Sequence, residues 1–399
     1  MDARATQAVR GETQPVEAAR RIAPLIQQYQ DEAERERRLS KPVVHAMGEA
    51  GLFRLLTPRS LGGLEVDPIT CAHVIEEVAA ADSAAAWSVF NPVGWSFLCA
   101  RLPDHGSEEI FADPHALIVG PFHPPMQAIP TDRGYRVTGR SPFVSNCRDA
   151  TWIGTTALIM EGATPRMGPG GMPEVIAAML RATDCEILDT WHVMGMRGTG
   201  SDDIRVQDVF VPQSRTFAVA PDFTPGSHYQ SPLYRFSMMG LLAAAFAPIV
   251  FAMARNAIDE VVNITRNKTP FGSATLLRDR HSTHSKLAQA EASLRSARAW
   301  LYETLSDTWR RVQAGEPVST RQRGDLLLTA VNGVSSAVRA VELMYSLAGT
   351  SGIYTKNPLE RHFRDLQVLK QHGFVSENRY ESVGQIYLGL APEFGAALL

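Results

Sequence analysis

A histidine and a glycine, His372 and Gly373, follow a charged segment that contains Arg361, Arg364 and Asp365. Two roles fit a histidine in this position. It could cap the end of a helix, because a cation is favourable near a helix C-terminus. It could equally be the acid or base of an active site, because imidazole titrates near neutral pH. The residues alone leave both roles open.

Other residues with metal or nucleophile chemistry do not form a recognisable motif. His281 and His284 lie three residues apart with no acidic partner at metal spacing, so we expect capping and surface roles and no metal site. P-loop, HExxH and GxSxG motifs are absent, and "GMRGTG" lacks the spacing of a dinucleotide-binding fingerprint. The cysteines show no CxxC spacing, and we expect them to be reduced packing residues: Cys71, Cys99, Cys147 and Cys185.

Composition excludes several classes of function. A net charge of -3 and a pI of about 6.4 provide no basic surplus for a nucleic-acid backbone. Hydrophobic residues make up 45% and charged residues 20% of the 399, as in a soluble globular enzyme. The N-terminus has no apolar targeting segment, and the apolar stretch from Gly240 is short and contains Pro248, so we expect a buried core helix. We therefore predict a cytoplasmic protein without nucleic-acid or membrane partners.

The hydrophobic period changes twice along the chain. Apolar residues recur every three to four positions in the first and last thirds, and with a period of two in the middle. We predict an α+β chain that is mostly α. Its parts are an N-terminal helical domain, a central antiparallel β-domain and a C-terminal four-helix bundle, over residues 1–115, 116–225 and 226–399.

Three segments in this order resemble the acyl-CoA dehydrogenase superfamily. They are "DTWHVMGMRGTGSDDIRVQDVFVP" from Asp189, "NKTPFGSATLLRDRHSTHSKLAQAEA" from Asn267 and "AGTSGIYTKNPLERHFRD" from Ala348. The resemblance covers nearly the whole chain and implies an acyl-CoA dehydrogenase-like fold. It also implies a homotetramer in which packing of one bundle on another completes a flavin site.

Members that dehydrogenate acyl-CoA commonly place a catalytic glutamate at the position of Gly373, and glycine cannot abstract a proton. The segment is more similar to a sister group, the oxygenase components of two-component flavin-dependent monooxygenases. Their pattern is a Gly/Ser-rich turn, then Ile-Tyr, Asn-Pro and Arg-Asp, with a histidine eight residues after that arginine. Arg364 and His372 have this spacing. The resemblance therefore implies that His372 is catalytic.

The same resemblance assigns residues to the flavin. In "SPFVSN", Ser145 takes the position of a hydroxyl beside flavin N5, with Phe143 and Asn146 next to it. Lys268 stands three residues before Phe271-Gly272, where a basic residue grips a flavin phosphate. Thr350 and Ser351 are candidates for the phosphate end or the ring edge. Ordinary turn and cap chemistry fits all of these polar residues as well.

The substrate side departs from the aromatic hydroxylases of this group. They often carry a histidine in the first helical domain, near the position held here by Trp95. We assign Trp95 and Phe122 to substrate binding, by stacking. A place in the hydrophobic core fits each of them too, and the same two alternatives apply to the aromatic residues Trp87, Phe90 and Trp152.

The resemblance implies the following function. The chain is the oxygenase component that uses reduced FMN, or FADH2, and O2 through a C4a-hydroperoxyflavin to hydroxylate or oxidise an aromatic or heteroaromatic small molecule. A separate reductase supplies the reduced flavin. Three alternatives stay open: an acyl-CoA dehydrogenase with a displaced base, an N-hydroxylating enzyme of the same fold, and a relative without catalytic activity.

Overall fold

The computed structural model describes residues 3–122, 125–168, 171–219 and 223–392. The first part of the chain is helical. Asp82 separates two of the helices, and its carboxylate accepts the backbone N–H of Ala85 at 2.8 Å, which caps the second one. The bounds are α1 (Ala3–Glu36), α2 (Lys41–Glu49), α3 (Pro68–Ala81), α4 (Ser83–Leu98) and α5 (Asp104–Phe111).

The middle of the chain forms a sheet. In the described residues the strand order is β7-β8-β3-β2-β4-β6-β9, with β1 and β5 paired to β4. The strands are β1 (Ile118–Val119), β2 (Met126–Thr131), β3 (Gly134–Val144), β4 (Trp152–Glu161), β5 (Thr164–Pro165), β6 (Val175–Arg181), β7 (Glu186–Leu188), β8 (Asp202–Pro212) and β9 (Thr216–Ala218).

Most neighbouring strands are antiparallel, but β1 and β2 both pair with β4 in parallel. The expectation of an antiparallel domain is therefore wrong for these two pairs, and the sheet is mixed. Side chains alternate between the two faces of a strand whatever the direction of its neighbour, so the period of two could not distinguish the two arrangements.

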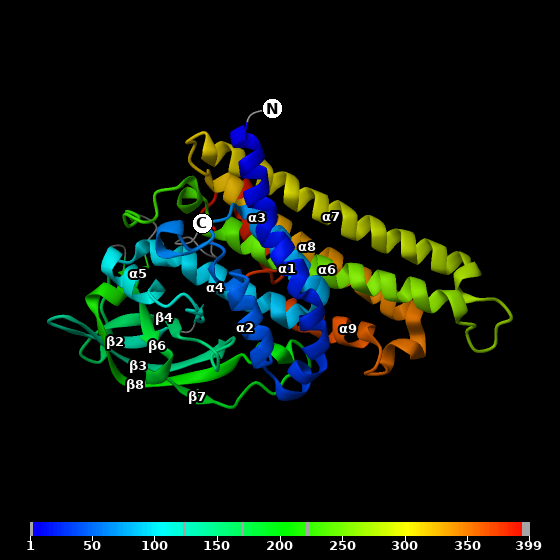
Figure 1. Cartoon of the computed structure of the whole chain (residues 1–399), viewed down its shortest axis with the longest axis horizontal. Coiled ribbons are helices and arrows are strands. Elements are labelled where there is room, and N and C mark those ends of the chain that lie inside the picture. The colour runs from blue at the N-terminus through cyan, green and yellow to red at the C-terminus, as the bar shows by residue number, and fades with distance from the viewer. Residues whose placement is uncertain (1–2, 123–124, 169–170, 220–222, 393–399) are drawn as a thin grey trace.

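Long helices return in the last part of the chain. Figure 1 shows α6, α7 and α8 running alongside one another, and each pair of them is in contact. The apolar window of α6 is 89% buried within the protein, which confirms that the stretch from Gly240 is a core helix. The bounds are α6 (Met238–Asn267), α7 (His281–Gln313), α8 (Thr320–Ala348), α9 (Pro358–Leu369) and α10 (Arg379–Tyr387).

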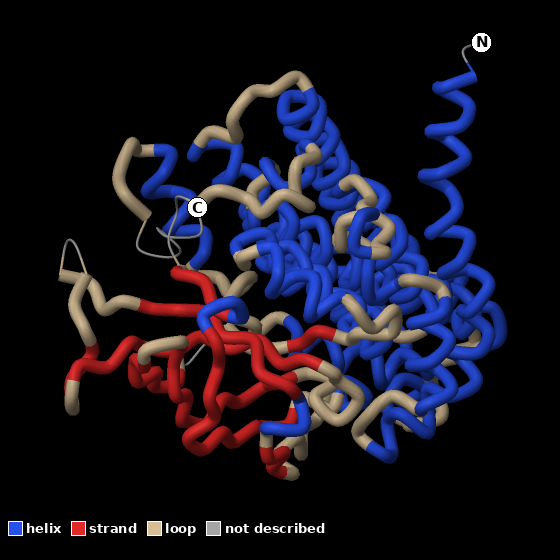
Figure 2. The backbone as a smooth tube through the Cα atoms, turned by 60° about the vertical axis from the view of Figure 1, so that its left-hand side comes forward, coloured by secondary structure: helices blue, strands red, loops and turns tan. Residues whose placement is uncertain are grey.

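The strands gather on one side of the molecule and the helices fill the rest (Figure 2). The helix α4 contacts α3 and α6 as well as β1, so it lies between the helices and the sheet. The predicted α+β, mostly α architecture is confirmed. Both predicted domain boundaries fall in connecting segments, after α5 and after β9.

Candidate active site

The helix α4 carries many of the side chains that meet at the candidate site. It is apolar on most of its surface and almost wholly buried, as a helix inside a protein must be. Ser83, Trp87 and Phe90 are spaced four and three residues apart, so they share one face of the helix. Ser88 follows Trp87, and its hydroxyl lies 3.0 Å from Oδ1 of Asn146.

The ends of two neighbouring strands position the serine that the sequence singled out. The ladder between β3 and β8 ends with the pair Val144 and Asp202, and its register shifts just before that pair. Within this irregularity Phe143 has a φ of 62°, a strained conformation for an aromatic residue. Such irregularities change the direction of the strand. Ser145 and Ser201 leave the sheet side by side, with their hydroxyl oxygens 2.8 Å apart.

One indole joins the two predicted catalytic residues. Trp87 Nε1 donates to Ser145 Oγ at 2.9 Å. The same indole lies edge-on to the imidazole of His372, with ring centroids 5.2 Å apart. Asn146 is next to Ser145 and its amide Nδ2 is buried without a hydrogen-bond partner among the described residues. The structure therefore brings together predicted site residues that lie far apart in the sequence.

His372 lies beyond the end of α9. The helix ends at Leu369, and Lys370 is its C-cap residue. The backbone N–H of Phe374 donates to His372 Nδ1 at 3.2 Å, which leaves the proton of a neutral ring on Nε2. Burial lowers the pKa of His372 to about 4, so the ring is uncharged at pH 7. Capping by a cation, the first alternative for this residue, is not supported.

Aromatic rings surround this imidazole. The rings of Phe246 and Phe90 join Trp87, with centroids 5.4 and 6.4 Å from that of His372. His372 nevertheless keeps exposed surface, and a Cβ added at Gly373 would meet nothing within 4 Å. The imidazole therefore borders a buried aromatic cluster and is exposed on its other side. A glutamate at position 373 would have room, so its absence is a matter of chemistry and not of space.

A buried carboxylate connects α9 to both α4 and the sheet. Asp365 Oδ2 accepts the hydroxyl of Ser83 at 2.6 Å, and its Oδ1 accepts the backbone N–H of Met196 at 2.5 Å. Burial raises the pKa of this carboxyl to about 6, although both hydrogen bonds oppose the shift. Its neighbour Arg364 donates to the carbonyl oxygen of Met194. The helix that leads to His372 is thus fixed to the segment that precedes β8.

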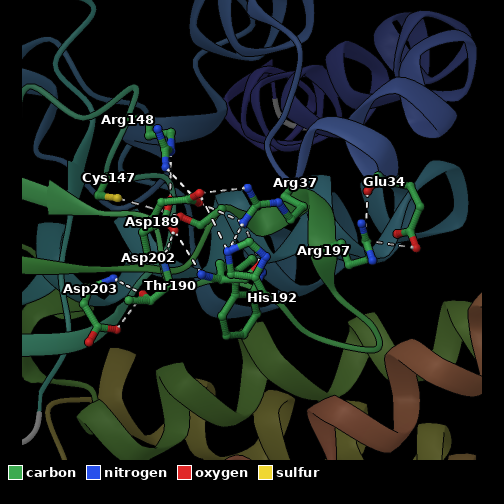
Figure 3. A network of polar contacts seen from close by, with 12 residues as sticks. Glu34, Arg37, Cys147, Arg148, Asp189, Thr190, His192, Arg197, Asp202 and Asp203 are labelled. Atoms are coloured by element: carbon green, nitrogen blue, oxygen red, sulfur yellow. Dashed lines mark hydrogen bonds and ion pairs between the residues drawn. The ribbon is translucent and has the colours of Figure 1, made fainter.

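A polar network holds that segment from the other side (Figure 3). Asp202 is buried, accepts from Arg148 Nε at 2.8 Å and accepts the backbone N–H of Thr190 at 3.0 Å. Arg37, just after α1, forms an ion pair with Asp189 at 2.8 Å. These contacts place the start of β8, and with it Ser201, relative to the N-terminal helices.

The predicted phosphate-binding residues form a separate group at the end of α8. Lys268 Nζ donates to the carbonyl oxygen of Ala348 and to Ser351 Oγ, the latter at 2.8 Å. Burial lowers the pKa of this lysine. Gly349 has a φ of 52°, and Thr350 is exposed beside it. In the structure Lys268 therefore satisfies the C-terminus of a helix, and phosphate binding by these residues stays a prediction.

Phe271 stands alone at the tip of the loop between α6 and α7. Figure 1 shows this loop projecting from the end of the bundle. The backbone N–H of Leu277 donates to the Lys268 carbonyl at 2.8 Å and closes the base of the loop. Phe271 is fully exposed. Phe143 is also largely exposed, and its ring lies edge-on to that of Trp191, 6.2 Å away.

Trp95 and Phe122 form a third group. Their rings are stacked with centroids 5.0 Å apart, and Trp95 Nε1 donates to the Gly120 carbonyl at 2.8 Å. Trp95 has no exposed surface, because it fits against Gly154, where an added Cβ would lie 2.3 Å from the indole. Only Phe122 presents a face to solvent, with 41% of its surface exposed. Substrate binding by this pair stays a prediction.

Three residues at the site were not assigned a role from the sequence. Trp87 was only one of several aromatic residues, whereas Ser201 and Asp365 were part of motifs without a stated function. The signal for Ser201 was present, because an antiparallel register that pairs the strand before Ser145 with the strand after Ser201 brings the two hydroxyls together. The contact between Trp87 and His372 depends on how the helices pack, which no local pattern specifies.

A hollow lies elsewhere in the described part of the chain. It has a volume of about 1030 Å³ and is lined by residues that include Glu49, Glu65, Leu233 and Trp309. None of the predicted site residues lines it. We place the candidate site by its chemistry, at Trp87, Ser145 and His372, and not by the volume of this hollow.

Known families match both helical parts of the chain. "Acyl-CoA dehydrogenase, N-terminal domain" matches residues 12–111, and "Acyl-CoA dehydrogenase, C-terminal domain" matches residues 244–377. The structure of XiaF from Streptomyces sp., in complex with FADH2 and glycerol, has a TM-score of 0.88 and 25% identity. It covers 98% of this chain and 99% of its own.

Two characterised proteins are similar over most of their length. Indole-3-acetate monooxygenase of Pseudomonas putida is 30% identical over 363 residues, which is 90% of this chain and 90% of that protein. The oxygenase component of FADH(2)-dependent resorcinol hydroxylase from Rhizobium sp. is 26% identical over 388 residues, 93% of each chain.

Proposed function

The chain belongs to the acyl-CoA dehydrogenase family, in its flavin-dependent monooxygenase branch, and we propose that it is the oxygenase component of a two-component system. It takes reduced flavin from a separate reductase and inserts oxygen into an aromatic or heteroaromatic small molecule. The similarity to indole-3-acetate monooxygenase and to the resorcinol hydroxylase component supports this substrate class.

One observation carries the assignment of the site. Trp87 contacts both Ser145, through a hydrogen bond of 2.9 Å, and His372, through ring centroids 5.2 Å apart. A hydroxyl for the flavin and an imidazole for the substrate therefore lie on two sides of one fixed indole. Neither residue type alone would distinguish a redox site from an ordinary core.

The residues present fit a flavin. The buried Nδ2 of Asn146 lacks a partner among the described residues, and a buried donor is expected to find an acceptor. We propose that Ser145 and Asn146 bind the ring edge, with Phe143 against the ring. Lys268, Thr350 and Ser351 would hold the phosphate end. Bound reduced flavin supplies the activation of O2, which no side chain can perform.

We propose that His372 acts as a donor through Nε2–H. Its pKa of about 4 makes the neutral ring a weak base at pH 7. A neutral imidazole can still donate a hydrogen bond from Nε2–H to an oxygen atom on the reacting side. The rings of Phe90 and Phe246 border one side of this imidazole and its other side is exposed, so a bound substrate that covers the exposed side would strengthen any hydrogen bond that Nε2–H makes.

The surroundings of His372 suit an aromatic substrate. Trp87, Phe90 and Phe246 present ring faces and edges around one imidazole donor, the usual composition of a small-molecule site. Phe122 offers a further exposed face. We propose that a planar substrate covers the exposed side of His372, next to this aromatic cluster, and directs its polar group to the imidazole.

We also propose a cytoplasmic homotetramer. A fully exposed phenylalanine at the tip of a closed loop is unfavourable in water, and burial against another copy of the chain would remove that cost. Phe271 holds this position. Its loop starts at Lys268, so the same contact would bring a partner subunit next to the proposed phosphate end.

The direct test is a rapid mixing experiment. Protein loaded with photoreduced FMN under argon is mixed with oxygenated buffer and either indole-3-acetate or resorcinol. We expect oxygenated product by mass spectrometry and less H2O2 than with FMN alone. The dehydrogenase alternative predicts a different result, because octanoyl-CoA would bleach bound oxidised flavin without O2. Bleaching of that kind, or failure to bind either FMN or FAD in both the oxidised and the reduced form, would refute the proposal.

A further inference from the structure

A chain of buried hydroxyls runs from Ser145 into the protein. Ser145 Oγ lies 2.8 Å from Ser201 Oγ, and Ser201 Oγ lies 2.7 Å from Thr199 Oγ1. Thr199 Oγ1 lies 2.8 Å from the carbonyl oxygen of Met196. All three hydroxyl residues are at least 95% buried, so solvent does not compete for these contacts.

The direction of every proton in this chain follows from counting. The Met196 carbonyl can only accept, so Thr199 must give it the single hydroxyl proton that it has. The contact between Thr199 and Ser201 then needs the proton of Ser201. The contact between Ser201 and Ser145 in turn needs the proton of Ser145.

Ser145 is therefore left without a proton for a ligand. Trp87 Nε1–H can only donate, and it occupies one of the two lone pairs of Ser145 Oγ. The other lone pair has no partner among the residues that the structure describes. Ser145, which as a residue type could donate or accept, is fixed by its neighbours as an acceptor toward the site.

We propose that Thr199 and Ser201 are positioning residues that make the site select reduced flavin over oxidised flavin. This inference rests on the proposed function, in which Ser145 meets flavin N5. Reduced flavin carries a hydrogen on N5 and can donate it to Ser145 Oγ. Oxidised flavin has a bare lone pair on N5, which would face the lone pair of Ser145.

The selection has practical value for an oxygenase that receives its flavin from another protein. Reduced flavin binds and reacts, and the oxidised flavin left at the end of the cycle loses its hydrogen bond at N5 and leaves. One net hydrogen bond corresponds to about a three- to tenfold change in affinity. We expect the ratio of the dissociation constants, oxidised over reduced, to change by this factor when the chain is broken.

Two substitutions break the chain at different points. Ser201→Ala removes the acceptor for the Ser145 proton, which can then turn toward the flavin. Thr199→Val removes the acceptor for the Ser201 proton, so Ser201 donates to Ser145 and again frees the Ser145 proton. Thr199→Ser keeps the hydroxyl and should preserve the wild-type ratio.

A matched control is available in the bundle. Thr329 in α8 is fully buried and its hydroxyl donates to the Leu326 carbonyl at 2.7 Å. Thr329→Val therefore removes a buried hydroxyl that has no part in the chain.

The experiment titrates each full-length variant with FMN and with photoreduced FMN under argon, following flavin fluorescence and absorbance. We expect Ser201→Ala and Thr199→Val to lower the oxidised-to-reduced ratio of Kd by about three- to tenfold, and Thr199→Ser and Thr329→Val to leave it unchanged. An unchanged ratio in both chain-breaking variants overturns the inference, as does an equal fall in Thr329→Val. If the wild-type protein binds neither FMN nor FAD in either redox form, the proposed function itself fails.

Discussion

Replacement of His372 is the sharpest test of the site. In His372→Ala the Nε2–H donor is lost, whereas Trp87, Phe90 and Phe246 keep their contacts with one another. His372 keeps exposed surface and its ring makes one hydrogen bond, to the N–H of Phe374. We therefore expect a small change in the melting temperature and a large change in chemistry.

The expected loss in the rate of product formation is on the order of a hundredfold or more, the usual effect of removing a positioned hydrogen-bond donor. His372→Gln retains an N–H donor on a shorter reach and should lose less. His372→Phe retains the ring packing without a donor and should resemble His372→Ala. Because burial lowers the pKa of His372 to about 4, the wild-type rate should stay flat between about pH 6 and 8 and decline only as His372 gains its proton at lower pH.

Single-turnover assays with reduced FMN measure the rate of product formation and the release of H2O2 in the same reaction. His105→Ala, which removes an exposed histidine on α5, is the matched control and should behave as wild type. Near-normal product formation in His372→Ala would refute the assignment. A wild-type rate that titrates with a pKa close to 6.5 would refute the neutral, buried state of the ring.

Three further predictions concern the supporting residues. Lys268→Ala should weaken FMN binding about tenfold or more if this ammonium meets the phosphate, whereas a purely capping lysine would alter thermal stability and leave the Kd unchanged. Burial raises the pKa of Asp365 to about 6, so its ionisation destabilises the folded state as pH rises from about 4 to 6. Asp365→Asn should remove this slope and gain at most about 3 kcal/mol over wild type at pH 7 in urea unfolding; a difference that does not depend on pH would contradict this. Phe271→Asp should shift the assembly toward smaller species in light scattering, and an unchanged mass would exclude the loop from the interface.

The sequence was informative wherever one local period dominated. Helical and strand periods predicted the three parts of the chain, and the charged segment before His372 indicated a helix that ends close to this histidine. The pairing direction of β1 and β2 was not predictable, because both directions bury alternate residues in the same way.

The candidate site was predictable only in pieces. Ser145 and His372 were identified separately, but their connection through Trp87 depends on the packing of α4 against α9 and the sheet. Trp95 shows the opposite case. Its position suggested a substrate contact, and the small volumes of Gly120 and Gly154 on neighbouring segments allow it to be fully buried instead.

The segment between Met194 and Ser201 holds the two halves of the site, His372 and Ser145, at a fixed separation. At one end it is bound to α9, where Asp365 accepts the N–H of Met196 and an added Cβ at Gly195 would lie 2.5 Å from the Arg364 carbonyl. At the other end it supplies Thr199 and Ser201 to the hydroxyl chain that ends at Ser145.

The charged pair before His372 therefore has a physical purpose that does not require it to touch a ligand. Arg364 and Asp365 fix α9 to the same segment that sets the proton order at Ser145, so imidazole and hydroxyl are positioned from one shared support. A change at Asp365 should then disturb both arms together. Asp365→Ala is expected to lower product formation and also to reduce the preference for reduced FMN, whereas His372→Ala should affect only the first.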